Sequence, residues 1–278
     1  MIIDFHTHTF PARIAEKAII GMQAASHASA FSDGTAAGLQ SSMAKTVDIC
    51  VVLPVATNPL KLVSMNDASI AENGKNGLVY FGAMHPMAEN WREELNRIAN
   101  AGIKGIKIHP HYQNTDIDDV RYLRILERAA ELGLITVMHA GWDIGFPGVL
   151  RCSPAMIRKA LQQVGRVPVV LAHMGGWKNW DQVYGELGDT GCYIDTALSI
   201  GKIAPLEQGY YTEEARKLLL PEDFCNLVNR FGAERVLFGT DSPWASQQEE
   251  IEKLMATALT REQKDRILYQ NAKQLLNI

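Results

Sequence analysis

The sequence alternates eight times between a short apolar segment and a longer segment with helical periodicity. Nearly continuous apolar runs such as residues 47–55 are typical of parallel strands that are buried on both faces by helices. The alternation predicts a (β/α)8 barrel, with a doubly wound open sheet as the alternative. The predicted strands span residues 1–8, 47–55, 78–84, 103–108, 134–138, 167–172, 192–195 and 235–239.

The open sheet is the less favoured architecture because the first predicted strand is not followed by a Gly-x-Gly-x-x-Gly or Walker-type loop. We find no linker rich in Pro, Gly or Ser, so we predict one α/β TIM-barrel domain over residues 1–278. Residues 23–42 are rich in Ala, Ser and Gly. We predict a flap insertion there, either mobile or helical. The alternative is a solvent-facing insertion without a functional role.

Amphipathic segments place the helices between these strands and at the end of the chain. Asp118 and Asp119 suit a first helical turn, and Thr260 with Gln263 matches the capping-box pattern of the last helix. The predicted helices span residues 11–22, 59–76, 88–101, 117–131, 154–164, 178–188 and 213–230, followed by two more.

Composition excludes several classes of function. The net charge is −4 and no Lys/Arg cluster is present, which argues against nucleic-acid binding. No apolar run approaches the roughly 20 residues that span a bilayer. The N-terminus lacks signal-peptide features, and the 4 cysteines have no Cys-x-x-Cys spacing. We therefore expect a cytoplasmic protein with reduced thiols.

The first predicted strand carries the pattern Asp4-x-His6-x-His8. Residues two apart point to the same face of a strand, so these three side chains should project opposite to Ile3 and Phe5. Two imidazoles at a strand's C-terminal end can bind one transition-metal ion.

Polar residues also end other predicted strands. In barrels of this kind, functional groups gather at the C-terminal ends of the strands because the loops there enclose one pocket. A single histidine at the end of a strand usually has a structural role, but polar residues at the same end of several strands indicate a shared site. These residues are His85, Lys107, His109, His139, His173 and Asp241.

Together these motifs resemble the amidohydrolase superfamily, across residues 4–243 and in the family's order. The segments 172–176 (AHMGG) and 238–243 (FGTDSP) are typical of the amidohydrolase-related branch. That branch includes aminocarboxymuconate-semialdehyde decarboxylase and the resorcylate and isoorotate decarboxylases. The resemblance is specific for the superfamily and does not identify a substrate.

The resemblance implies one divalent metal, with Zn²⁺ favoured and Mn²⁺, Fe²⁺ or Co²⁺ also suited. Its implied ligands are His6, His8, His139 and Asp241. His173 would act as a general acid/base, and Asp241 would also accept a proton from water. Asp4 would orient Lys107 or a ligand histidine from behind, or form a buried ion pair without a catalytic role.

Lys107 has two interpretations. In binuclear members of the family the lysine on this strand is carbamylated and bridges two metals, whereas the decarboxylase-like branch generally uses one. We therefore favour one metal, with Lys107 as a cation that pairs with Asp4 or with a substrate carboxylate. His85, His109 and Trp177 are predicted as supporting or substrate-binding residues.

The leading functional prediction is a metal-dependent hydrolase in which water activated on the metal attacks a small polar substrate. The alternative is a metal-dependent non-oxidative decarboxylase of a small carboxylated ring or enol. Its cationic partner for the carboxylate would be Lys107, Arg151 or Lys178. A metal-binding barrel without turnover is a third reading. The expected partner is a small molecule, and a homodimer is expected by analogy alone.

Overall fold

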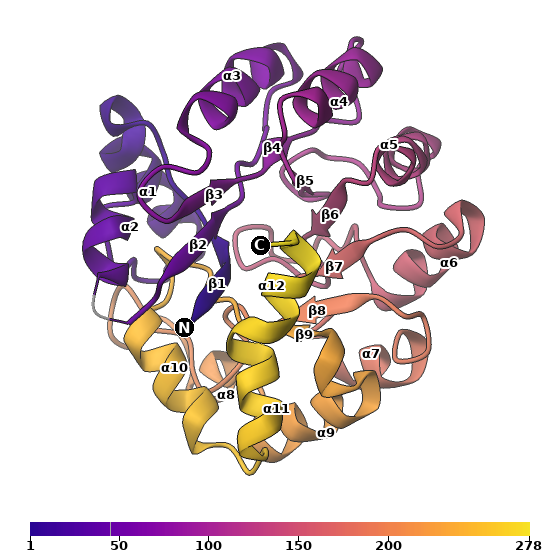
Figure 1. Cartoon of the computed structure of the whole chain (residues 1–278). Helices are drawn as coiled ribbons and strands as arrows, with labels where there is room; N and C mark the ends of the chain where they lie inside the picture. Colours follow the sequence, from indigo (N-terminus) through magenta and orange to yellow (C-terminus); the bar gives the residue numbers. More distant parts are fainter. Residues whose placement is uncertain (45) are drawn as a thin grey trace.

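The computed structural model describes residues 1–44 and 46–278, in which short parallel strands form a ring covered on its outside by helices (Figure 1). All eight predicted strands are present, and the third is divided into β3 and β4 around Phe81. The strands are β1 (Ile3–Thr7), β2 (Ile49–Val52), β3 (Leu78–Tyr80), β4 (Gly82–Ala83), β5 (Gly105–Ile108), β6 (Ile135–Met138), β7 (Val169–Leu171), β8 (Tyr193–Asp195) and β9 (Val236–Leu237).

The helices follow the strands in the alternation that the sequence predicts. The α-helices are α1 (Ala12–Ser26), α2 (Ala36–Met43), α3 (Leu62–Glu72), α4 (Trp91–Asn100), α5 (Val120–Glu131), α6 (Pro154–Val164), α7 (Trp180–Glu186), α8 (Glu213–Arg216), α9 (Pro221–Phe231), α10 (Gln247–Ala256), α11 (Arg261–Asp265) and α12 (Asn271–Leu276). Short 3-10 turns are η1 (Pro59–Lys61) and η2 (Ala233–Arg235), and η3 (Arg266–Gln270) is a π-helical turn.

Neighbouring strands pair in chain order, first β1-β2-β3 and then β4 through β9, all in parallel. The two sheets adjoin where the Phe81 N–H donates to the Val52 carbonyl at 3.0 Å. At the other seam, the Phe5 N–H donates to the Phe238 carbonyl at 2.7 Å. A doubly wound sheet reverses its strand order at a switch point, whereas this sequential order fits the predicted (β/α)8 barrel.

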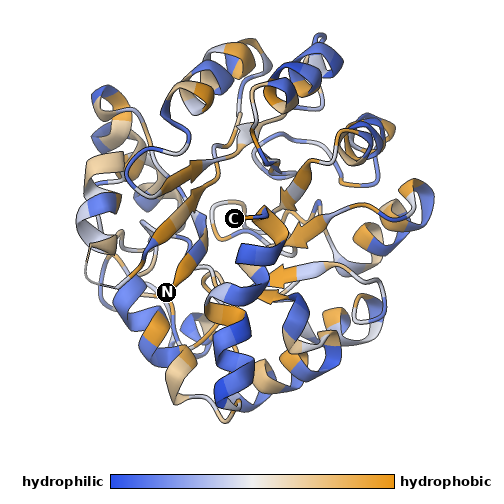
Figure 2. Ribbon diagram, viewed as in Figure 1, coloured by the Kyte–Doolittle hydropathy of each residue, from blue (hydrophilic) through white to orange (hydrophobic). Residues whose placement is uncertain are grey.

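The inside of the ring is filled by apolar side chains, and the ribbon of the strands that carry them is largely orange in Figure 2. Phe5 and Phe81 meet edge to face, with ring centroids 5.8 Å apart. Helix α12 lies over the centre of the ring in Figure 1, and its Ala272 and Leu276 join the same cluster. We call this cluster the apolar end: Ile3, Phe5, Val51, Leu53, Phe81, Ile135, Val137, Val170, Leu237, Ala272 and Leu276.

Several predicted helices differ from the structure at their ends. The helix predicted over 59–76 ends at Glu72, and the one predicted over 88–101 begins at Trp91. The segment predicted as one helix over 213–230 is divided into α8 and α9, because Pro221 begins α9 and holds Leu220 in an extended conformation. The helix predicted from residue 117 begins at Val120, because the Asp119 side chain caps it by accepting from the Arg121 N–H. The capping box at Thr260 and Gln263 is confirmed.

The predicted flap contains an ordered helix, α2, in accordance with the helical alternative. Backbone hydrogen bonds fasten the segment to the strand ends, from Phe10 N to the Gly34 carbonyl and from Phe31 N to the Pro243 carbonyl, both at 2.7 Å. Ala28 also forms a bridge with Pro205. Residues 23–42 therefore lie against the carboxyl ends of the strands.

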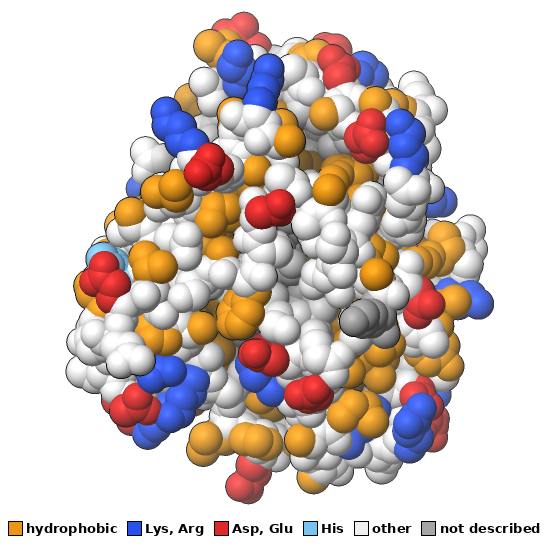
Figure 3. All heavy atoms as spheres, turned by 90° about the vertical axis from the view of Figure 1, so that its left-hand side faces the viewer, with side chains coloured by type: hydrophobic (Ala, Val, Ile, Leu, Met, Phe, Trp, Pro, Cys, Tyr) orange, Lys and Arg blue, Asp and Glu red, His pale blue; other side chains and the backbone are white. Residues whose placement is uncertain are grey.

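Charged groups of both signs are interspersed with hydrophobic side chains on the face shown in Figure 3. None of the helices among residues 1–44 and 46–278 is long and apolar enough to cross a membrane.

Candidate metal centre

A cavity of about 770 Å³ opens at the C-terminal ends of the strands. The floor of the cavity is polar. It is formed by six residues at the open end of the barrel, which we call the polar mouth: His6, His8, Lys107, His139, His173 and Asp241. Its walls are largely apolar and include Phe10, Ile14, Met22, Val55, Met65, Ile144, Leu198 and Trp244. The cavity could hold a small molecule with an apolar or planar body.

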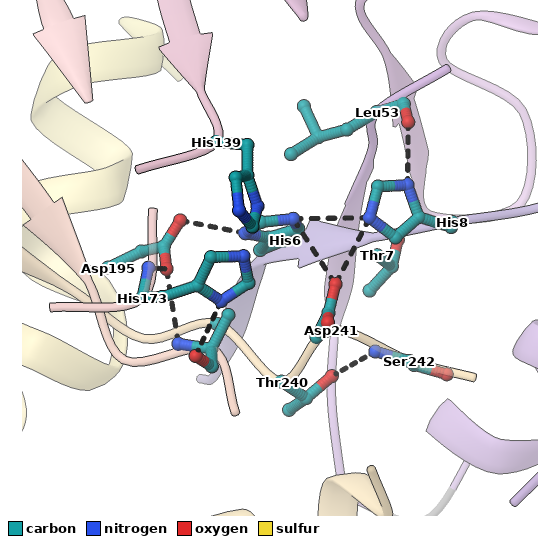
Figure 4. A network of polar contacts seen from close by, with 12 residues as sticks. His6, Thr7, His8, Leu53, His139, His173, Asp195, Thr240, Asp241 and Ser242 are labelled. Atoms are coloured by element: carbon teal, nitrogen blue, oxygen red, sulfur yellow. Dashed lines mark hydrogen bonds and ion pairs between the residues drawn. The ribbon is translucent and has the colours of Figure 1, made fainter. Parts of the chain in front are cut away.

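Three potential metal ligands converge at this floor (Figure 4). His6 Nε2 lies 3.2 Å from His8 Nε2, and Asp241 Oδ1 lies 3.4 Å from the first nitrogen and 3.1 Å from the second. Of the predicted ligands, the structure therefore brings His6, His8 and Asp241 into one group.

Both histidines of this group are held by their other nitrogen. His6 Nδ1 donates to Asp195 Oδ2 at 2.8 Å, and His8 Nδ1 donates to the Leu53 carbonyl at 2.7 Å. When both rings are neutral, His6 Nε2 and His8 Nε2 each carry a lone pair, and the two nitrogens lie next to each other. Burial, reinforced by the charge of Lys107, lowers the pKa of His6 well below its usual value, so this ring is neutral at pH 7.

This donor set fits a divalent transition metal. Two bare nitrogens and a carboxylate oxygen about 3 Å apart repel one another unless a cation lies between them. Bonds of about 2.0–2.2 Å from Zn²⁺ to nitrogen and oxygen place neighbouring ligands at such separations. Burial by itself raises the pKa of Asp241, but the close contact with His8 and the nearby His6 and His173 outweigh it and hold that pKa below its usual value. The carboxylate is therefore ionised.

His139 lies beside this group without joining it. Its Nε2 donates to the Trp142 carbonyl at 2.9 Å, which leaves the lone pair on Nδ1. Its ring packs against that of His173, with centroids 4.9 Å apart. The ligand atoms of the other three predicted residues lie within 4.8 Å of one another, but the group does not include His139. Its role as a fourth ligand stays a prediction.

Asp195 organises the floor, and sequence reasoning missed it. Besides holding His6, it accepts hydrogen bonds from the backbone N–H groups of His173 at 2.9 Å and Ala197 at 3.1 Å. It stands at the end of β8, so the rule that identified the other strand-end residues would have found it. Such a carboxylate–histidine pair orients a metal ligand and raises its basicity.

His173 and Asp241 both adopt left-handed backbone conformations, with φ of 60° and 65°. Residues other than glycine rarely do so, and strain of this kind concentrates at functional sites. His173 Nδ1 donates to the Ala197 carbonyl at 2.9 Å, so its Nε2 is the nitrogen available to a bound molecule.

Lys107 is buried, with 1% of its surface exposed, and its Nζ lies 3.1 Å from His6 Nε2. Burial lowers the pKa of Lys107 to about 8, and the carboxylates of Asp195 and Asp241 limit that decrease. The side chain is therefore mostly protonated at pH 7. Arg151 pairs instead with Asp116 at 2.9 Å, and Lys178 donates to the Ala215 carbonyl at 3.2 Å.

Asp4 does not share a face with His6, which corrects the prediction from residue parity. The pairing of β1 with β2 shifts by one residue between Asp4 and Thr7, and such a shift reverses the direction of the side chains. Asp4 instead accepts hydrogen bonds from the Thr240 hydroxyl at 2.6 Å and from Gln247 Nε2 at 2.8 Å. It also accepts from the backbone N–H of His6 at 3.2 Å, so it holds the backbone of a predicted ligand histidine and the neighbour of Asp241, and does not contact Lys107 by a hydrogen bond.

Two further predicted site residues do not line the cavity. His85 is buried, and its Nδ1 accepts from the Met87 N–H at 3.1 Å, which is a local turn contact. Trp177 packs in a separate apolar cluster with Ala28 and Ile203. His109 does line the cavity, together with Asp143, which the sequence analysis did not select.

The sequence comparisons agree with these motifs. The family model described as "Amidohydrolase" matches residues 3–278. No curated protein matches the chain.

Several solved structures share the fold. A 2,6-dihydroxybenzoate decarboxylase from Rhizobium matches with a TM-score of 0.68 and 15% identity, covering 99% of this chain and 98% of that one. A dihydroxybenzoic acid decarboxylase from Polaromonas sp. JS666, with bound manganese and 2-nitroresorcinol, matches at 0.64 and 12%, covering 99% and 96%. A putative 2-pyrone-4,6-dicarboxylic acid hydrolase from Pseudomonas putida matches at 0.63 and 19%, covering 99% and 97%.

Proposed function

Because the chain belongs to the amidohydrolase family, we propose that it is a metal-dependent decarboxylase of a small carboxylated ring or enol. The observation that carries the proposal is the convergence of His6, His8 and Asp241 beside the buried cation of Lys107. The apolar walls of the cavity suit a planar substrate and an uncharged product such as carbon dioxide.

The comparisons favour this reaction over the hydrolysis that the sequence analysis ranked first. Two of the three structures named above are decarboxylases of dihydroxybenzoic acids, and one of them contains manganese. At identities of 12% and 15% these likenesses establish the fold and leave the substrate to experiment. They do not distinguish zinc from manganese.

His6, His8 and Asp241 would hold the metal, and His139 would add its Nδ1. When bound, the metal supplies a Lewis acid that polarises an oxygen atom of the substrate. A metal held by His6 Nε2 would engage the lone pair that accepts from Lys107 in this structure. The ammonium group becomes available for the substrate carboxylate, whose charge it neutralises in the closed cavity.

His173 supplies the proton in this scheme. Protonated at Nε2, it transfers that proton to the carbon that bears the carboxylate. The bond between this carbon and the carboxylate then breaks, its electron pair returns to the ring, and carbon dioxide leaves. One carbon–hydrogen bond forms and one carbon–carbon bond breaks, and no oxygen from water enters either product.

The proposal is tested by loading the protein with Mn²⁺ or Zn²⁺ and supplying 2,6-dihydroxybenzoate, 5-carboxyvanillate and related carboxylated phenols. We expect release of carbon dioxide and, in D₂O, one deuterium at the carbon that lost the carboxylate. Lys107→Met should reduce this activity strongly. Lys178→Met is the matched control, because Lys178 lies outside the cavity, and it should retain full activity.

Hydrolysis is the second candidate, and the pyrone dicarboxylic acid hydrolase among the similar structures favours it. Incubation of lactone and amide substrates in H₂¹⁸O separates the two reactions. Uptake of ¹⁸O into a carboxylate product without carbon dioxide would replace decarboxylation by hydrolysis. Retention of metal with no turnover of either substrate class would favour the binding barrel.

A further inference from the structure

A second group of potential metal ligands lies in the wall of the same cavity, and the proposed function does not use it. His109 and His111 follow β5, and Asp143 follows β6. One ligand atom from each lies within 4.8 Å of the others. The group is separate from His6, His8 and Asp241, and the inference drawn from it does not depend on the reaction proposed above.

His111 is the best-defined member of this group. Its Nε2 donates to the Val149 carbonyl at 3.2 Å, so the neutral ring carries its lone pair on Nδ1. That nitrogen is buried and has no hydrogen-bond partner among the described residues. Only 2% of the residue is exposed, so no bulk solvent reaches it.

His109 and Asp143 face each other without forming a hydrogen bond. His109 Nε2 lies 3.4 Å from Asp143 Oδ2, and the other carboxylate oxygen accepts from the Gly145 N–H at 2.7 Å. The Nδ1 atom of His109 is also buried and unpartnered within the described chain. His109 Nε2 and Asp143 Oδ2 are therefore close enough to share one ion and are not already joined by a hydrogen bond.

The protonation states suit metal binding. Burial lowers the pKa of His111 to about 4, and burial together with Lys107 lowers that of His109 well below its usual value. Burial raises the pKa of Asp143 to about 6, so at neutral pH the carboxylate is mostly ionised beside two neutral rings. A buried acceptor without a partner destabilises the fold, and a bound cation would remove that cost at His111 Nδ1.

We propose that His109, His111 and Asp143 form a second binding site for a divalent transition metal of the Zn²⁺ type. Two imidazoles and one carboxylate are a preferred ligand set for such ions, and three protein ligands leave a position for water or a substrate oxygen. His109 and Asp143 line the cavity whereas His111 lies behind them, so the open position faces the cavity.

The site differs from a pair of metals bridged by a carbamylated lysine. The ring of His139 stacks on that of His109, with centroids 4.2 Å apart and planes at 14°. His139 Nε2 also lies 3.7 Å from Asp143 Oδ2, so the second ion would lie beside His139, at the ends of β5 and β6, and would not need Lys107.

Zinc stoichiometry tests this proposal. The metal-free full chain is titrated with Zn²⁺ in bicarbonate-free buffer, and bound zinc is measured by mass spectrometry after gel filtration. We expect two equivalents in the wild type and in Lys107→Met, and one in His111→Gln. His85→Gln is the matched control, because His85 is a buried histidine outside both groups, and it should retain two.

Zinc-edge anomalous diffraction of the wild type gives the position of each ion without any substitution. A peak at His109, His111 and Asp143 supports the site even if His111→Gln fails to fold. One equivalent in the wild type, or two in a folded His111→Gln variant, overturns it. A second equivalent that requires bicarbonate and Lys107 also overturns it, because that result identifies the bridged pair.

Discussion

The two ends of the barrel are built from the same strands and differ in what they do. In β6, Ile135 and Val137 point into the apolar end, and the next inward position is His139 in the polar mouth. Helix α12 covers the apolar end, whereas the polar mouth forms the floor of a cavity. Two residues along a strand separate side chains that stabilise the fold from side chains that carry the chemistry.

The comparison shows that the apolar end stabilises the fold, whereas the polar mouth lowers the stability of the fold. Each large side chain buried in the apolar end contributes about 1.5–3 kcal/mol. The polar mouth instead buries Lys107, places bare nitrogens against each other and strains the backbone at His173 and Asp241. We expect substitutions at the two ends to separate stability from activity.

The largest expected effect is that of His8→Ala. It removes one of the three proposed ligands, so metal binding should be lost and turnover should fall by about 10³-fold or more. The thermal unfolding of the metal-free protein should barely change. Metal analysis and calorimetry of the same sample check both results, and a variant that keeps its metal would remove His8 from the ligand set.

Phe81→Ala should give the opposite pattern. Deleting this buried ring leaves a cavity in the apolar end and should lower the free energy of unfolding by about 3–5 kcal/mol. The folded fraction should bind metal as the wild type does. Denaturant titration with parallel metal analysis checks this, and loss of metal from folded protein would show that the two ends are coupled.

Asp195→Asn should lower metal affinity by about 10–100-fold, because Asp195 orients His6 without being a ligand itself. Competition with a fluorescent chelator measures the change. Equal affinity in the variant and the wild type would mean that the hydrogen bond to His6 does no more than pack the ring.

The activity of the metal-loaded enzyme should fall as the pH rises above about 8. Burial lowers the pKa of Lys107 to about 8, and the charge that we propose to bind the substrate carboxylate is lost above this pKa. The decline approaches about tenfold per pH unit, and a bound cation moves it to lower pH. The Lys107→Met variant should have low activity at every pH and should not show this alkaline decline. If the decline persists in the variant, a residue other than Lys107 causes it.

The fold was predictable because short apolar strands and amphipathic helices alternate in a regular order along the chain. Two of the boundary errors come from single residues, since Pro221 divides a periodic segment and Asp119 caps a helix instead of joining it. Neither competing effect is visible in hydrophobic periodicity alone.

The site was predictable to the extent that strand ends identify it. His6, His8 and Asp241 converge as expected, whereas Asp4 does not, because a one-residue shift in the pairing of β1 cannot be read from residue parity. His85 looked equivalent to them in sequence, but its side chain serves a turn. A position at a strand end therefore helps to identify residues of this site, but it does not by itself show that a residue belongs to the site.

The most direct test of the account is metal-edge anomalous diffraction from crystals loaded with Mn²⁺ or Zn²⁺. We predict an ion bonded to His6 Nε2, His8 Nε2 and Asp241 at about 2.0–2.3 Å, with Lys107 turned away from His6. The contradictory result is a fully loaded crystal with no ion on these three atoms and the ammonium of Lys107 still bonded to His6.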